Sequence, residues 1–137
     1  MSLNKGFSTL TFEMVTLEDR NNRLLNRREI KLILKDASGR LSRMNAADLI
    51  AKEFNADRKA VVPIKMGSEK GSTDIHSTFY IYESVGQMND QLPRYRVLRN
   101  MEKTERKKLL DEEKGRRLKA KQSAVAEAKT SGSRGRR

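Results

Sequence analysis

The sequence predicts an α+β fold with the element order β-β-α-β-β-α. This is an antiparallel four-stranded sheet with helices packed on it, followed by a basic, largely helical C-terminal extension. Three observations support the prediction. Several segments alternate apolar and polar residues with the period of two that half-buried strands show. One segment between them has apolar residues at helical spacing. The C-terminal part combines helix-favouring residues with few large apolar side chains.

The first two strands are predicted before residue 40. Residues 8–17 alternate apolar and polar side chains, whereas residues 18–22 are polar and turn-prone. Residues 28–35 alternate again, with apolar residues at every second position. Residues 36–39 (Asp-Ala-Ser-Gly) have the composition of a turn. We therefore expect two antiparallel strands joined by the polar segment.

The clearest helix is predicted over residues 42–55, where apolar residues recur three and four positions apart. Either Ser42 or Asn45 can cap its N-terminus. Residues 60–66 are rich in strand-forming residues, but Pro63 has no backbone N–H to donate to a sheet. This third strand is therefore expected to be an edge strand or a bulged one.

The fourth strand is predicted over residues 78–83, after a loop of small residues at 67–77. Ser84 and Gln87 then form the S-x-x-Q pattern of a helix capping box. Apolar residues continue at helical spacing until Pro93, which ends or interrupts that helix.

The charge is unevenly distributed along the 137 residues, which carry a formal net charge of +12. Residues 1–84 contain 14 Lys+Arg and 11 Asp+Glu, and residues 85–137 contain 16 and 7. We therefore predict a globular domain over 1–101 and a basic extension over 102–137. The extension is polar on nearly every side, so we expect it to be helical to about residue 129, then disordered unless bound.

The composition argues against several classes of site. The chain has no Cys and a single His, which excludes disulfides and thiolate ligands and argues against a histidine-based zinc site. The loop at 67–73 lacks the Gly-Lys-Ser/Thr spacing of a phosphate-binding loop. The acidic run Asp111–Glu113 lies among Lys and Arg, where ion pairs such as Asp111 with Lys114 or Glu112 with Arg116 explain it better than a metal. We expect no enzyme activity, metal or cofactor, and no apolar run approaches a membrane span.

The basic residues carry the functional signal, because an excess of Arg and Lys indicates a polyanionic partner, nucleic acid first. An Arg guanidinium matches two phosphate oxygens at once. Tyr95, which lies among arginines, could stack on an unpaired base or pack on the core. A free-standing RNA- or DNA-binding regulator remains the alternative. The candidate nucleic-acid-binding residues are Arg20, Arg23, Arg27, Arg28, Arg94, Arg96, Arg99, Lys103, Arg106, Lys107, Lys108, Arg116 and Arg117.

Four segments resemble, in order and spacing, the small-subunit ribosomal protein family number twenty-four of eukaryotes and archaea. Asn22–Ile30 (NRLLNRREI) is similar to the Asn-Arg-Leu-Leu-x-Arg-Lys signature of that family. Thr78–Ser84, Pro93–Val97 and Lys103–Lys107 resemble its later segments. The resemblance spans roughly residues 9–121, and the basic extension resembles eukaryotic-type members.

The resemblance implies a structural constituent of the small ribosomal subunit, with no catalytic activity. Such a protein would bind small-subunit rRNA and neighbouring ribosomal proteins, and would support rRNA maturation, subunit assembly and translation. It implies a cytoplasmic location in the ribosome, with nucleolar passage during assembly. We expect no membrane partner, no small-molecule substrate and no homo-oligomer. The resemblance extends rRNA contact to the matching residues Arg23, Arg27, Arg28, Arg94, Arg96, Lys103, Arg106 and Lys107.

Overall fold

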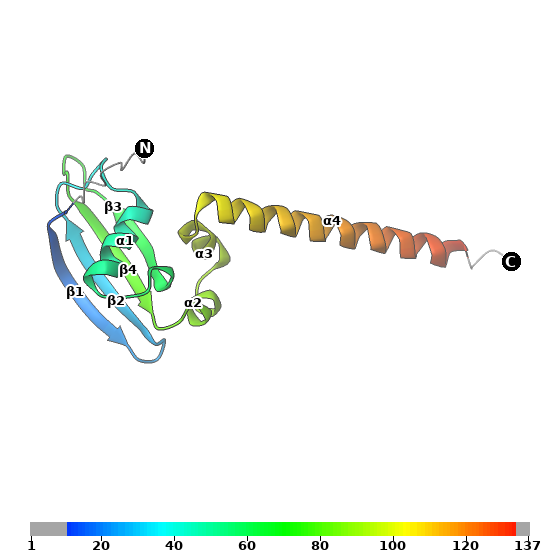
Figure 1. The fold of residues 1–137 in the computed structure, drawn as a ribbon, viewed down its shortest axis with the longest axis horizontal. Helices are drawn as coiled ribbons and strands as arrows, with labels where there is room; N and C mark the ends of the chain where they lie inside the picture. Colours follow the sequence, from blue (N-terminus) through cyan, green and yellow to red (C-terminus); the bar gives the residue numbers. More distant parts are fainter. Residues whose placement is uncertain (1–10, 134–137) are drawn as a thin grey trace, which may run out of the picture. The chain divides into compact units, whose positions relative to one another are not determined.

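A computed structural model describes residues 11–133 and confirms the α+β fold with its antiparallel four-stranded sheet (Figure 1). The chain divides into two compact units, Met1–Asn100 and Met101–Arg137. The first unit holds the sheet, and the second holds one long helix. The elements are β1 (Met14–Asn22), β2 (Arg27–Leu34), α1 (Arg43–Glu53), the 3-10 helix η1 (Arg58–Ala60), β3 (Val61–Gly67), β4 (Ile75–Tyr82), α2 (Val85–Gln91), α3 (Arg94–Asn100) and α4 (Lys103–Ser133).

The first strand lies later in the sequence than its apolar alternation predicts. The strand predicted over 8–17 is β1 at Met14–Asn22, and residues 8–10 lie outside the described part of the chain. The segment 18–22, predicted as a turn, pairs with β2 instead, and the turn falls at 23–26. The physical reason is that β1 is an exposed edge strand. Its pairing is supported by contacts between charged residues, such as Lys31 Nζ to Glu18 Oε2 at 2.5 Å, rather than by an apolar face.

The core forms where the two central strands meet helix α1. The strand order is β1-β2-β4-β3, so β2 and β4 are the inner pair. Ile30 lies opposite Phe79, and both side chains are fully buried. Leu32 lies opposite Ser77, whose hydroxyl donates to the Leu32 carbonyl at 3.2 Å. That hydrogen bond satisfies a polar group that would otherwise be costly to bury.

Helix α1 covers one face of the sheet (Figure 1). Ser42 is its N-cap, because its side chain accepts a hydrogen bond from the Asn45 N–H at 3.2 Å. Small and branched residues on one side of the helix, including Ala47 and Ile50, are completely buried. Asn55 has a φ of 49° just after the helix, a conformation that Asn tolerates better than most residues.

Strand β3 is both an edge strand and a bulged one, as Pro63 predicts. It pairs only with β4 among the described strands, and its register shifts between Pro63 and Lys65. Because Pro lacks an N–H, an edge position next to a bulge loses little hydrogen bonding.

Helices α2 and α3 replace the single helix predicted after β4. Pro93 separates them, because it cannot supply the N–H that a continuous helix needs. Ser84 caps α2 by accepting from the Gln87 N–H at 3.4 Å. A complete capping box would also have the Gln87 side chain accept a hydrogen bond from the Ser84 N–H. That bond is absent from the described residues, because Gln87 Oε1 has no hydrogen-bond partner among them.

Five buried apolar residues lie outside the main core cluster, and η1, β3, β4, α2 and α3 contribute them: Ala60, Val62, Tyr82, Met88 and Val97.

Helix α4, considered by itself, is a 31-residue helix without a sustained apolar face. The helix runs to Ser133, past the end predicted near residue 129. The prediction of disorder without a partner also covers residues 134–137, which lie outside the described residues. The Thr130 hydroxyl donates back to the Glu127 carbonyl at 2.8 Å, which is compatible with continued helix. The ion pairs predicted for Asp111 and Glu112 are wrong, because neither carboxylate lies within ion-pair distance of its predicted cation.

Candidate nucleic-acid interface

Four candidate arginines lie at one end of the sheet. Arg20 belongs to β1, Arg23 to the turn, and Arg27 and Arg28 begin β2. The antiparallel register places Arg20 opposite Glu29, so the hairpin brings the four residues to the same end. They nevertheless differ in what their guanidinium groups contact.

Arg28 is held by a carboxylate on the neighbouring strand. Its Nε donates to Asp19 Oδ1 at 2.8 Å and its Nη2 to Asp19 Oδ2 at 2.5 Å. The guanidinium also lies 4.8 Å from the centre of the Phe54 ring. The hydrogen bond from Arg28 holds the pKa of the Asp19 carboxyl below its ordinary value. Arg28 therefore uses its bidentate geometry within the protein.

Arg27 is more deeply enclosed. Its Nε donates to Glu29 Oε1 at 2.8 Å and its Nη1 to the Tyr82 hydroxyl at 3.3 Å. The guanidinium lies 4.1 Å from the centre of the Tyr80 ring. Burial alone would lower the pKa of Arg27, but its hydrogen bonds to Glu29 and Tyr82 outweigh burial and raise the pKa. These contacts make Arg27 part of the sheet's own packing.

Arg20 and Arg23 present their charges outward. Both side chains are exposed, and within residues 11–133 neither forms a hydrogen bond or ion pair. Arg20 acts on Glu29 only at longer range, where its charge helps to lower the pKa of that carboxyl. Of the four hairpin arginines, these two are the best placed to contact a phosphate without breaking an existing bond.

The arginines of α3 surround an exposed tyrosine. Arg96 donates from Nη1 to the Ile64 carbonyl at 3.0 Å and from Nε to the Tyr95 hydroxyl at 3.1 Å. The guanidinium groups of Arg96 and Arg99 lie 5.6 Å and 5.9 Å from the centre of the Tyr95 ring. Tyr95 is 55% exposed, so packing in the core is excluded. Arg94 and Arg99 are exposed, whereas Arg96 is half-buried and fastens α3 to β3.

The remaining candidate residues all lie on α4, in the second unit. Because successive residues of a helix are turned by about 100°, neighbouring cations point in different directions around it. These residues are Lys103, Arg106, Lys107, Lys108, Arg116 and Arg117. Four of them, Lys103, Arg106, Lys107 and Arg117, fall within about 100° of one side of the helix. Lys108 and Arg116 lie on other sides.

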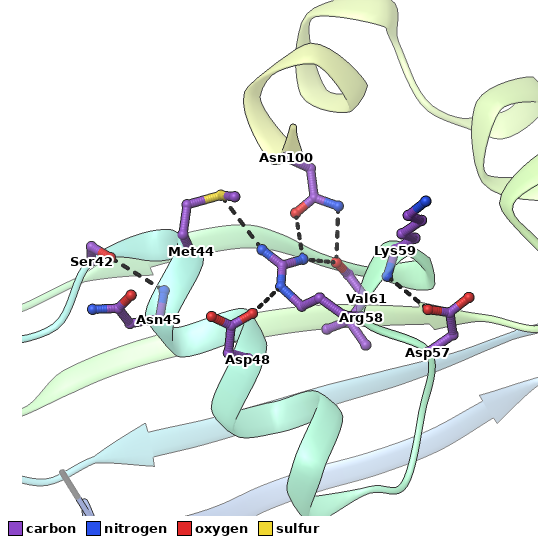
Figure 2. A network of polar contacts seen from close by, with 9 residues as sticks. All are labelled: Ser42, Met44, Asn45, Asp48, Asp57, Arg58, Lys59, Val61 and Asn100. Carbon is purple, nitrogen blue, oxygen red and sulfur yellow. Dashed lines mark hydrogen bonds and ion pairs between the residues drawn. The ribbon is translucent and has the colours of Figure 1, made fainter. Parts of the chain in front are cut away.

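Sequence reasoning missed a polar network centred on Arg58 (Figure 2). Arg58 forms an ion pair with Asp48 of α1, and its Nη1 donates to Asn100 Oδ1 at 3.2 Å. Asn100 Nδ2 in turn donates to the Val61 carbonyl at 3.1 Å. The network joins α1, η1, β3 and the last residue of α3. No local sequence signal could have found it, because Arg58 and Asn100 are far apart in the chain.

Metal sites and membrane spans were both predicted to be absent. Among residues 11–133 there is no group of three or more His, Asp or Glu side chains that could hold a metal ion. The same part of the chain has no helix long and apolar enough to cross a membrane.

The comparison with known families decides the class of the protein. The model of the family "Ribosomal protein S24e" matches residues 12–101, which is most of the chain. The chain belongs to the ribosomal protein S24e family. It is also similar to a protein of Methanosarcina barkeri (strain Fusaro / DSM 804) named small ribosomal subunit protein eS24. The two are 34% identical over 85 residues, covering 62% of this chain and 84% of the archaeal one.

Membership in the S24e family confirms the resemblance found in the sequence motifs. The matched segment contains the hairpin and α3, and therefore the seven candidate arginines from Arg20 to Arg99. Helix α4 lies beyond it, so its six candidate residues gain nothing from the family match. No comparison tests RNA contact at individual positions, and all thirteen residues stay predictions.

Proposed function

We propose that this member of the S24e family is a structural constituent of the small ribosomal subunit, where it binds small-subunit rRNA through Arg and Lys contacts to phosphates. In this role it supports rRNA maturation, subunit assembly and translation. The family match over residues 12–101 carries the proposal, and the name of the archaeal relative agrees with it. The exposed arginines of the hairpin and α3 supply chemistry suited to a phosphate backbone.

The proposed mechanism divides the arginines into two groups. Arg27 and Arg28 hold the hairpin together through their bonds to Glu29 and Asp19. Arg20 and Arg23, exposed on that hairpin, then contact phosphates from a backbone that is already ordered, so the cost in conformational entropy is confined to their side chains. Each phosphate that a cation neutralises releases condensed counterions, which favours binding.

The extension at 102–137 acts differently in this proposal. Most of its candidate cations share one side of α4, so that side suits a phosphate backbone that runs along the helix. The globular domain at 1–101 sets the position, and the extension becomes ordered along rRNA. We further propose neighbouring ribosomal proteins as partners, a cytoplasmic location in the ribosome with nucleolar passage during assembly, and a monomeric chain.

Sedimentation with small subunits from the source organism tests the proposal. At moderate salt the chain should migrate with the small subunit in a sucrose gradient, and its affinity for small-subunit rRNA should fall steeply as salt rises. The double variant Arg20→Ala/Arg23→Ala should reduce the slope of log affinity against log salt by about 1.5. Lys65→Ala/Lys70→Ala makes the same charge change near the opposite end of the sheet and should leave the slope unchanged.

Two results would contradict the proposal. Binding that does not depend on salt would remove the phosphate mechanism. A chain that stays at the top of the gradient at every salt concentration would point to the free-standing RNA- or DNA-binding regulator instead.

A further inference from the structure

Leu24 is the most exposed large apolar side chain in the described part of the protein. It lies in the turn at 23–26 between β1 and β2, and 95% of its surface is accessible. The next most exposed, Leu118 and Leu17, are at 60% and 59%. A leucine so placed contributes almost nothing to the stability of the fold, because burial is what makes an apolar side chain stabilising.

The turn that carries Leu24 is fixed on both sides of it. Asn22 Oδ1 accepts a hydrogen bond from the Leu25 N–H at 3.3 Å. Gln91 of α2 donates from Nε2 to the Leu25 carbonyl at 2.8 Å. Asn26 has a φ of 47°, the left-handed conformation that Asn adopts more readily than most residues. Leu24 therefore projects from a turn that does not have to be ordered when a partner binds, which lowers the entropic cost of binding.

The charge around Leu24 indicates the kind of partner. Residues 19–29 hold four arginines and two carboxylates. Both carboxylates are already bonded, Asp19 to Arg28 and Glu29 to Arg27. Arg23 directly precedes Leu24 and is exposed without a bond among residues 11–133. The partner must therefore present an apolar surface close to negative charge.

An unstacked nucleobase meets both requirements, because its flat face is apolar and its phosphates lie a few bonds away. Leucine is one of the side chains that proteins insert against base steps as an apolar wedge. RNA offers such bases in its loops and bulges. An apolar pocket of another protein would need a separate set of carboxylates around it to match the arginines.

We propose that Leu24 packs against the face of an unstacked small-subunit rRNA base while Arg23 and Arg20 contact the adjoining phosphates. This inference rests on the proposed function and names the contact that positions the hairpin on the RNA. It assigns Leu24 a role that charge alone does not supply, and it predicts that the two kinds of contact respond differently to salt.

Titrations of the full chain with small-subunit rRNA separate the contributions. Leu24→Ala should weaken binding about tenfold and leave the salt slope unchanged, because no counterion is released by an apolar contact. Leu24→Met, which preserves apolar volume, should bind nearly as well as the parent chain. Leu17→Ala is the matched control, since Leu17 is also exposed but lies within β1, and it should have no effect.

The outcomes distinguish this inference from the proposed function. If the parent chain binds rRNA in a salt-dependent way but Leu24→Ala binds equally tightly, the inference fails and the proposed function stands. If the parent chain does not bind rRNA, both fail. A photo-crosslinking residue at position 24, placed in assembled small subunits, should attach to a nucleotide. Attachment to a ribosomal protein, or to nothing, would overturn the base contact even where the chain is present in the subunit.

Discussion

Arg28 donates two hydrogen bonds to the Asp19 carboxylate across the first two strands. Its Nε lies 2.8 Å from Oδ1, and its Nη2 lies 2.5 Å from Oδ2. Arg23, five positions earlier and in the same sequence motif, forms no bond within residues 11–133. Arginines that look alike in the sequence therefore fall into two physical groups. One group stabilises the hairpin, and the other remains available to a partner.

Replacing Arg28 should lower stability more than it lowers RNA affinity. Arg28→Ala removes a bidentate ion pair and the contact with the Phe54 ring, each worth about 0.5–1 kcal/mol at a partly exposed site. We expect the free energy of unfolding to fall by about 1–1.5 kcal/mol in urea titrations. Arg23→Ala should stay within about 0.5 kcal/mol of the parent chain. Equal destabilisation by both variants would contradict this division of roles.

Acid should weaken the hairpin through Asp19 and Glu29. The hydrogen bond from Arg28 lowers the pKa of Asp19 below its ordinary value of 3.8. Burial alone would raise the pKa of Glu29, but bonds from Arg27 and Asn22 lower it below 4.5. A lowered folded-state pKa stabilises the protein above the unfolded-state value, and that stabilisation is lost as the pH falls through the folded-state value.

Thermal unfolding measured between neutral pH and pH 2 tests this linkage. The parent chain should lose stability below about pH 4.5, and Asp19→Asn should show a shallower loss because it lacks one of the two linked groups. Asp57→Asn is a suitable control, since Asp57 makes only a local backbone contact as the N-cap of η1. A parallel acid response in Asp19→Asn and the parent would show that the ion pair contributes nothing.

The Arg58 network should anchor the end of α3. Arg58→Ala leaves Asn100 Oδ1 without its donor and breaks the ion pair with Asp48 (Figure 2). Losing hydrogen bonds at a partly buried site should cost about 1–2 kcal/mol. Relative to the parent chain, Arg58→Ala should accelerate amide hydrogen exchange more in α3 than in the β2–β4 core. Lys59→Ala removes the neighbouring exposed cation and should change neither quantity; if it matches Arg58→Ala, the effect is one of charge alone.

The fold was predictable wherever burial imposes a pattern on the sequence. β2 is inner, so Ile30, Leu32 and Leu34 alternate, and its bounds were predicted to within a residue. Pro63 has no backbone N–H and correctly predicted that β3 is an edge strand or a bulged one; it is both. β1 was misplaced because its pairing depends on cross-strand charge contacts. Such contacts leave no apolar periodicity to detect.

The candidate site was predictable as a composition but not as a geometry. An excess of Arg indicates a polyanion, and ordered motifs indicated the family that the comparisons confirm. Which arginines are already bonded depends on strand register and on aromatic neighbours such as Tyr80 and Phe54. The turn that carries Leu24 receives a hydrogen bond at the Leu25 carbonyl from Gln91, which is far away in the sequence. Neither relationship can be read from local spacing.

Two glycines should respond in opposite ways to substitution by alanine. Gly115 lies inside α4, and an added Cβ would meet no atom within 4 Å. Because Gly costs about 0.5–1 kcal/mol relative to Ala in a helix, Gly115→Ala should raise the helical circular dichroism of the free chain. If the extension becomes ordered on rRNA, this variant should also gain affinity, since part of the ordering cost is removed in advance. Gly39 has a φ of +75°, where a side chain is strained, so Gly39→Ala should instead lower the free energy of unfolding by about 1 kcal/mol. For Gly115→Ala, a gain in helicity without any gain in affinity would mean that binding to rRNA does not depend on helix formation in α4.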